Sequence, residues 1–293
     1  MSVVAAVQVL ILGLLLGGVY ALMASGLTLL FGVMGVVNLA HAAFIVVGAF
    51  FSFFLWQLLG VDPLISMVLA LPVFFLFGVV LYRLLFPRIE GSPRFTEMTV
   101  LMTFGLAFMA EGLMSYFFTG IFRSASPSYA RESIDIGAFY LPTGQFLASL
   151  ASAALLIGLW AFLKYTRTGY GVRATMQNRD AAQIVGVDVR RVSMISFGIG
   201  MAVAGAAGAL VSFIFPFFPS RHWQWIAILL SLVVLGGMGS LKGAVIGALG
   251  LAVISAFVSF LVGPVWAPIT FFGALFIVLL VRPQGLFGKK ARA

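Results

Sequence analysis

The sequence contains no cysteine and only two histidines among its 293 residues. Without cysteine there is no disulfide framework and no thiolate chemistry, and two histidines argue against a metal site built by the protein. Charged residues make up only 9% of the chain, which excludes a soluble globular domain with a solvated exterior. We therefore expect no metal and no cofactor.

The signature motifs of common enzymes are also missing from the sequence. It has no phosphate-binding glycine loop followed by Lys-Ser or Lys-Thr, no G-x-G-x-x-G after a strand pattern, no H-E-x-x-H and no G-x-S-x-G. We expect neither an ATPase nor a zinc protease, and no catalytic residues. An intramembrane enzyme that uses His41 or Glu111 would lack a second catalytic group at a usable spacing.

Long apolar runs dominate what is present, since 62% of the residues are hydrophobic. A membrane span needs roughly 20 apolar residues, and only Asp62 is formally charged before Tyr82, so no basic region of a cleavable signal peptide precedes the first run. The sequence predicts an all-α polytopic membrane protein, one transmembrane domain over residues 1–293, with eight or nine helices. We place them near 6–30, 38–57, 64–86, 97–118, 146–163, 192–214, 224–238, 243–262 and 266–281.

The net charge of +9 is concentrated in the connections 83–97 and 164–191 and in the tail 282–293, which share one side of this topology. The opposite connections balance three arginines against three carboxylates: Arg123, Arg131 and Arg221 against Asp62, Glu132 and Asp135. The positive-inside rule assigns the basic side and the tail to the cytoplasm. Nine full spans would put the N-terminus outside, and a re-entrant first segment would reverse that. Clustered charge of this kind argues against nucleic-acid binding.

A short internal repeat links residues 31–40 with residues 235–244, at an offset of 204. Both copies read G-x-M-G between apolar runs, with Gly32 and Gly35 in the first and Gly236 and Gly239 in the second. In the expected topology the repeat is parallel. The glycines indicate either helices interrupted beside a cavity or another subunit, or close helix packing. For either site alone, close packing is the favoured interpretation. The matching positions of the two sites give the interpretation as interrupted helices nearly as much support.

Polar side chains inside apolar spans are costly, so each is a candidate for a substrate path. These candidates are Tyr20, Thr28, Asn38, His41 and Glu111. Asn38 and His41, three residues apart, are expected to share a helix face; the alternative for His41 is a neutral imidazole bonded to a carbonyl. Glu111 lies 14 residues beyond Glu97, about 21 Å along a helix. Glu111 could couple a stand-alone carrier to protons, although no second intramembrane carboxylate accompanies it. The alternative is a structural role, in which Glu111 is protonated or bonded to Ser and Thr hydroxyls.

The connection 164–191 has the composition of a short helix. Residues 173–185, between Gly171 and Gly186, are rich in helix formers, and Asp188 can cap the helix that follows. The connection is either an orientation signal or a segment that docks into a groove of another protein.

Six blocks, in order along nearly the whole chain, together resemble the permease subunits of high-affinity branched-chain amino-acid ABC importers, a family that includes amide and urea permeases. The blocks are residues 18–22, 32–41, 103–112, 169–186, 235–244 and 282–288. In this family Gly and an acid often follow the position of His41, whereas this sequence has Ala42 and Ala43. If that acid contacts substrate, the ligand here is less cationic or less polar.

The resemblance implies an inner-membrane permease subunit without catalysis of its own. It implies a homologous second permease, two cytoplasmic ATPase subunits and a periplasmic solute-binding protein as partners, and it adds Thr103 to the path candidates. The connection 164–191 would couple ATPase closure to the spans, through Gly169, Arg173, Asn178, Ala181, Ala182 and Gly186. Leucine, isoleucine and valine are the family's default substrates, and amides, urea, aromatic acids and other amino acids are left open. Whether the partner permease is a homologue or a second copy is also left open.

Overall fold

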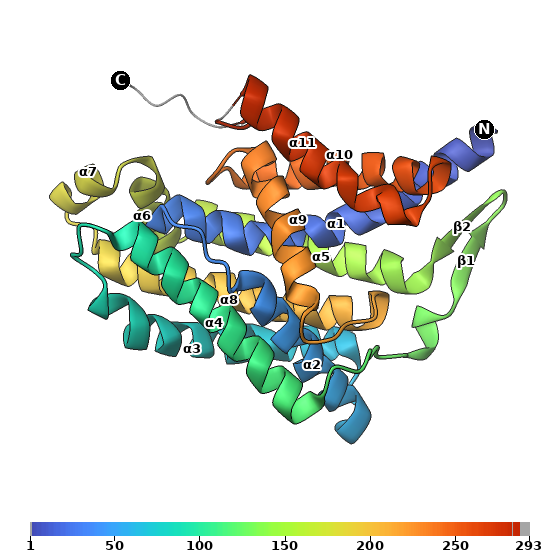
Figure 1. Ribbon diagram of the computed structural model, residues 1–293, viewed down its shortest axis with the longest axis horizontal. Coiled ribbons are helices and arrows are strands. Elements are labelled where there is room, and N and C mark those ends of the chain that lie inside the picture. The colour runs from blue at the N-terminus through green and yellow to red at the C-terminus, as the bar shows by residue number, and fades with distance from the viewer. Residues whose placement is uncertain (1, 283, 288–293) are drawn as a thin grey trace.

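The computed structural model describes residues 2–282 and 284–287, which form a bundle of α-helices with one small hairpin (Figure 1). Eight helices in this part of the chain are long and apolar enough to cross a membrane, and α9 is a shorter apolar helix. The expected all-α polytopic fold is therefore confirmed. The nine apolar helices are α1 (Val3–Met34), α2 (His41–Leu59), α3 (Pro63–Leu85), α4 (Phe95–Phe118), α5 (Thr143–Tyr165), α8 (Val189–Ile214), α9 (Arg221–Gly236), α10 (Leu241–Leu261) and α11 (Ala267–Val281).

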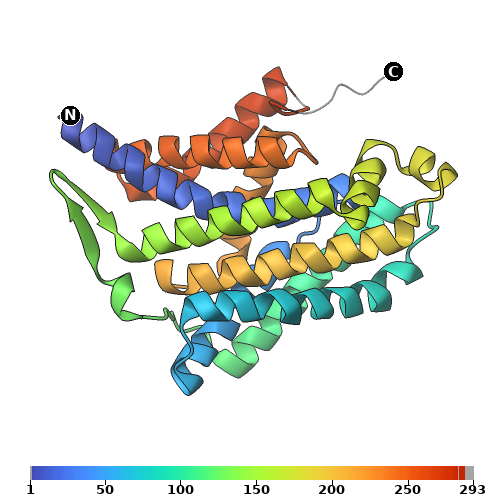
Figure 2. The same ribbon diagram turned by 180° about the vertical axis from the view of Figure 1, so that it is seen from behind.

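The bundle has two distinct ends, which Figures 1 and 2 show from opposite sides. At one end lie the N-terminus and an antiparallel hairpin of β1 (Ser133–Ile136) and β2 (Phe139–Pro142). At the other lie α6 (Arg167–Gln177) and α7 (Arg179–Ile184). The described residues also contain three short 3₁₀ turns: η1 (Phe86–Arg88), η2 (Ser128–Ala130) and η3 (Pro264–Trp266).

Helix α8 forms the centre of the bundle and packs through small residues. A methyl group added at Gly208 would overlap the carbonyl oxygen of Ile45 in α2, and one added at Gly48 would lie 2.6 Å from the carbonyl oxygen of Gly205. Without a hydrophobic driving force between helices in lipid, such close backbone approach supplies the dispersion contacts that hold the helices together.

Helix α1 is continuous over 32 residues, so it is a full helix and not a re-entrant segment. Its Gly13 and Gly17 face α10, where added methyl groups would lie 2.8 Å from the Cα of Val253 and 3.0 Å from the Cα of Leu249. The four-residue spacing places both glycines on one face, and α10 rests in the groove they leave.

The glycine repeat marks two helix ends that touch each other. Gly35 terminates α1 with φ 69°, and Gly239 lies in the turn after α9 with φ 81°, conformations that favour glycine. Gly32, in contrast, is inside α1 and Gly236 is the last residue of α9, so neither of them interrupts a helix. A methyl group added at Gly239 would lie 3.1 Å from the Cα of Gly32, so the two copies pack against one another.

The basic connection contains two helices where the sequence predicted one from Arg173 to Val185. The break is Asn178, which has extended backbone (φ −159°, ψ 113°) and whose Oδ1 accepts the N–H of Ala181 at 3.0 Å. Its side chain therefore caps α7 and ends α6. The expected cap of the next helix is present, since Asp188 Oδ1 accepts the N–H of Arg191 at 2.9 Å.

Two further features involve connections. The hairpin β1–β2 was not expected within residues 119–145; it turns at Gly137, with φ 61°. Nearby, the Tyr129 hydroxyl donates to Asp62 Oδ1 at 2.9 Å. Of the expected tail 282–293, residues 283 and 288–293 lie outside the described residues, and within the rest the N–H of Leu286 donates to the carbonyl of Leu235 at 2.8 Å.

Candidate functional site

A cavity of about 500 Å³ opens between α1, α5, α10 and the strand β2. It lies toward the end of the bundle that carries the N-terminus and the hairpin. Aliphatic side chains make up most of its wall, and polar groups enter from three helices: Tyr20 from α1, Gln145 from α5, and Ser255 and Ser259 from α10. Apolar walls with a few convergent polar groups are typical of a small-molecule site.

Tyr20 is the one sequence-predicted path residue that lines this cavity. Its ring is held by Phe271 in an edge-on contact at 5.8 Å and by Phe215 at 6.5 Å between ring centroids. Gln145 Oε1 is buried and accepts no hydrogen bond from the described residues. Gln145 itself lines the cavity, so its side-chain amide is within reach of a ligand there.

Thr28 and His41 lie in the core and not in the cavity. The Thr28 hydroxyl donates to the carbonyl of Ala24 at 2.8 Å within its own helix, and His41 Nε2 donates to the carbonyl of Met23 at 3.1 Å. Both side chains are fully buried. For His41 the structure therefore shows the alternative reading, an imidazole bonded to a neighbouring carbonyl.

Asn38 precedes α2, which begins at His41, so the two residues do not share a helix face as expected. Asn38 Oδ1 accepts the N–H of Ala40 at 3.1 Å, whereas the buried Nδ2 donates no hydrogen bond to the described residues. Next to it, the N–H of Leu39 donates to Thr103 Oγ1 at 3.2 Å. Asn38 and Thr103 thus belong to a junction that ties the α1–α2 connection to α4.

Glu111 binds two ring donors of α9 instead of Ser or Thr hydroxyls. Its Oε2 accepts the indole N–H of Trp223 at 2.8 Å and His222 Nε2 at 3.1 Å. The His222 side chain is fully buried and that of Glu111 is 22% exposed. The Trp223 ring also contacts Phe104 and Phe108 of α4, at 5.5 and 5.0 Å between centroids. This cluster joins α4 to the first turn of α9.

Helices α6 and α7 place the predicted coupling residues at the opposite end of the bundle from the cavity. Ala182 is buried and Gly169 packs on the carbonyl of Phe162, whereas Ala181 is exposed. The Arg173 guanidinium lies 4.7 Å from the centroid of the Tyr170 ring. Gly186 has φ 86° and forms the turn after α7.

Two apolar side chains at this end protrude from the protein. Ile184 and Val185, at the end of α7, are 86% and 77% exposed. Nearby, Met176 of α6 packs against Gly32 of α1 and reaches Gly239 after α9. The segment 164–191 therefore has an inner face in contact with two helix ends and an outer tip without intramolecular cover.

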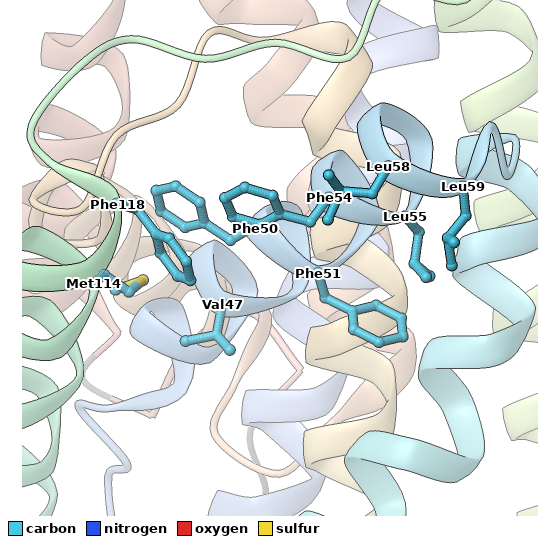
Figure 3. Close-up of a pocket in the computed structure, with 9 residues that line it drawn as sticks. All are labelled: Val47, Phe50, Phe51, Phe54, Leu55, Leu58, Leu59, Met114 and Phe118. Carbon is cyan, nitrogen blue, oxygen red and sulfur yellow. The ribbon is translucent and has the colours of Figure 1, made fainter.

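A second hollow, about 420 Å³, lies on the outside of α2 beside α4 (Figure 3). All nine residues that line it are apolar, among them Phe50, Phe54, Met114 and Phe118. Such a wall offers no hydrogen bond to a polar solute, so this groove is not a candidate for the substrate path.

Residues 9–280 match the family described as "Branched-chain amino acid transport system / permease component". The high-affinity branched-chain amino acid transport system permease protein LivH of Salmonella typhimurium is 27% identical, with 94% of each chain covered. BraD of Pseudomonas aeruginosa, a permease protein of the same description, is 26% identical, with 96% of this chain and 95% of BraD covered.

Among solved structures, PsaBC from Streptococcus pneumoniae in complex with Fab has the same fold, with a TM-score of 0.50 and 16% sequence identity. The match covers 96% of this chain and 94% of that chain.

Proposed function

The chain belongs to the family of branched-chain amino acid transport permeases, and from that premise we propose that it is the transmembrane permease subunit of an ATP-binding-cassette importer. The proposed substrates are branched-chain or related amino acids, which are the substrates that the names of its relatives give. The chain supplies the passage, and separate ATPase subunits supply the energy, since its own sequence has no nucleotide-binding motif.

The mixed cavity between α1, α5 and α10 is the observation that carries this proposal. Its aliphatic walls suit an aliphatic side chain, and the Gln145 amide and the hydroxyls of Tyr20, Ser255 and Ser259 suit the ammonium and carboxylate groups of an amino acid. A volume of about 500 Å³ lies in the range of small-molecule sites.

The charge distribution supports an orientation in which the α6 and α7 end faces the cytoplasm of an inner membrane. The connections at that end are 83–97, with three arginines, and 164–191, with six cations. With nine crossings the N-terminus is then outside and the C-terminus inside. The cavity opens toward the outer end, where a periplasmic solute-binding protein would deliver its ligand.

The segment 164–191 supports coupling to two cytoplasmic ATPase subunits. The exposed apolar tip of Ile184 and Val185 suits an apolar groove on a partner. On the inner side Met176 contacts the end of α1 and the turn after α9. A displacement of α6 and α7 by a bound ATPase would therefore move the end of α1 and the turn after α9. A homologous second permease would complete the passage.

The Glu111 and His222 pair favours one alternative, a stand-alone carrier coupled to protons. A carboxylate and an imidazole in contact within the spans can exchange a proton. The indole of Trp223 occupies the same carboxylate oxygen, however, which makes the pair a fixed interhelical contact. The two functions differ in what energises uptake.

The test is uptake of radiolabelled leucine into liposomes that contain the complex purified through this chain from its native membrane. We expect two ATPase subunits and a second permease to copurify, and uptake to require internal ATP and the binding protein. Gln145→Leu should lower uptake while assembly stays intact, and Gln57→Leu, the same change at an exposed position of α2, should not. Uptake by the chain alone under a pH gradient without ATP would establish the alternative.

A further inference from the structure

A cleft of about 710 Å³ lies between the last turns of α3 and the first turns of α8, separate from the cavity described above. It is at the end of the bundle that carries α6 and α7. Its wall changes character along its length: one part is formed by cations and the other by apolar side chains of two membrane-crossing helices. The cavity does not use these groups, and the cleft shares only Asp188, Arg190 and Arg191 with the segment 164–191, at its far end from α6 and α7.

Three guanidinium groups line the polar part of the cleft: Arg83 from α3, and Arg190 and Arg191 from α8. Arg190 lies 3.5 Å from Glu90. Within residues 2–282 and 284–287, no carboxylate lies within 4.0 Å of Arg83 or Arg191. Arg83 instead directs its Nε–H to the sulfur of Met194 at 3.3 Å.

The carboxylates near these cations are already engaged. Asp188, which lines the cleft, accepts the N–H of Arg191 as the cap of α8, and Glu90 is shared between Arg190 and Arg179, the latter at 3.8 Å. Three cations against these two carboxylates leave the polar part positive. An anionic group with several acceptor oxygens is the complement of guanidinium groups placed in this way.

The apolar part extends from these cations along the helices. Phe75 and Val79 of α3 and Ile195 of α8 form it together with the Met194 side chain. Phe75 and Val79 lie close to α8 because Gly198 has no side chain; an added methyl group there would be 2.9 and 3.0 Å from them. Phe75 is eight residues from Arg83, about 12 Å along the helix. A ligand that fills the cleft is therefore amphiphilic, with an anionic head and an apolar tail.

We propose that this cleft binds an anionic phospholipid of the surrounding membrane, with its phosphate on Arg83 and Arg191 and an acyl chain along Phe75, Val79 and Ile195. The apolar wall belongs to helices that cross the membrane, so lipid reaches it without leaving the bilayer. Basic pockets between membrane helices bind lipid head groups by this combination of charge and depth. A soluble phosphate would use the cations alone and leave the apolar wall uncovered.

The test is native mass spectrometry of the purified complex, stripped of lipid and then titrated with phosphatidylglycerol or phosphatidylcholine of identical chains. We expect phosphatidylglycerol to bind with about tenfold or greater preference, since each cation near the head group adds to the affinity. The double variant Arg83→Gln, Arg191→Gln should remove that preference. The matched control Arg88→Gln, Arg94→Gln makes the same charge change at exposed positions outside the cleft and should keep it.

A second pair of variants tests the acyl part. Ile195→Trp fills the apolar wall with all cations in place and should weaken phosphatidylglycerol binding, whereas Ile157→Trp, on an exposed face of α5, should not. Melting temperatures would verify that each variant is folded. Three results would each overturn the proposal. The two double arginine variants could lose the preference for phosphatidylglycerol equally, the two lipids could bind equally well, or millimolar inorganic phosphate could displace phosphatidylglycerol.

Discussion

The contact of Glu111 with His222 and Trp223 makes a quantitative prediction about how α4 is held. Helix α4 has few intramolecular contacts with other helices, and two hydrogen bonds of 2.8 and 3.1 Å attach its Glu111 to α9. An interhelical hydrogen bond within a membrane contributes about 0.6 kcal/mol on average and up to about 1.7. Glu111→Met, which keeps the length of the side chain and removes both acceptor bonds, should therefore destabilise the protein by about 1–3 kcal/mol.

A double-mutant cycle isolates the carboxylate and imidazole pair. We would measure the free energy of unfolding by SDS titration in mixed micelles for Glu111→Met, His222→Phe and their combination, with Glu97→Met, an exposed first-turn residue of the same helix, as the control. The combination should cost less than the sum of the single changes by about 0.6–1.7 kcal/mol, and Glu97→Met should cost almost nothing.

Additive losses within about 0.3 kcal/mol would refute the reasoning, because they would mean that the two side chains do not stabilise one another. The same variants report on function. If the pair is a fixed contact in an ATP-driven permease, Glu111→Gln should retain ATP-dependent uptake, whereas a carrier coupled to protons through Glu111 would lose it.

Two further predictions concern packing and the outer connections. Gly208→Ala, in the crossing of α2 and α8, should destabilise the protein by about 1–3 kcal/mol, because the added methyl group overlaps backbone that cannot rotate away; Gly112→Ala, with open space around it, should be neutral or slightly stabilising in the same titration. Burial raises the pKa of the Tyr129 hydroxyl above its ordinary value of about 10, and the hydrogen bond and charge of Asp62 raise it further. The phenol therefore loses its proton at a lower pH in the unfolded chain than in the folded one. Its contribution to the free energy of unfolding is complete below pH 10 and is lost as the pH rises above 10. Tyr129→Phe should thus cost about 1 kcal/mol near neutral pH and show a shallower loss of stability between pH 10 and 11; an unchanged slope would contradict this assignment.

The positions of the nine apolar helices could be predicted from the sequence because length and hydropathy decide which segments cross a membrane. Their ends agree with the expected ranges to within a few residues, since local features set them. Asp62 and Asp188 cap α3 and α8 by accepting backbone N–H groups. These signals lie within a few residues of the feature they determine.

Some features that were missed did carry a local signal. Asn178 followed by Asp180 in the next turn is a helix start, and it could have divided the basic connection into two helices. The alternation of residues 133–136 before Gly137 is typical of a hairpin. In both places a single capping or turn residue determines the structure, whereas the composition of the longer segment around it does not show the break.

The candidate site could not be predicted in the same way. Glu111 and His222 are 111 residues apart, and only the crossing of α4 and α9 brings them together. The hydroxyl of Thr28 looks the same in the sequence as that of Ser255, yet one bonds to its own helix and the other lines the cavity. Which face of a helix lines the cavity depends on how the neighbouring helices pack against it. Among the predicted path residues, Tyr20 alone is on such a face.

The packing of α1 against α10 has a consequence for the synthesis and folding of the chain. Gly13 and Gly17 emerge from the ribosome near the start of synthesis, whereas Val253 and Leu249, which cover them, emerge more than 230 residues later. At a synthesis rate of roughly 5–20 residues per second, the glycine groove of α1 faces lipid for at least about ten seconds before its partner exists. Chains that stop before α10 would therefore leave the glycine face of α1 exposed to lipid, without the backbone contacts that hold it in the complete protein.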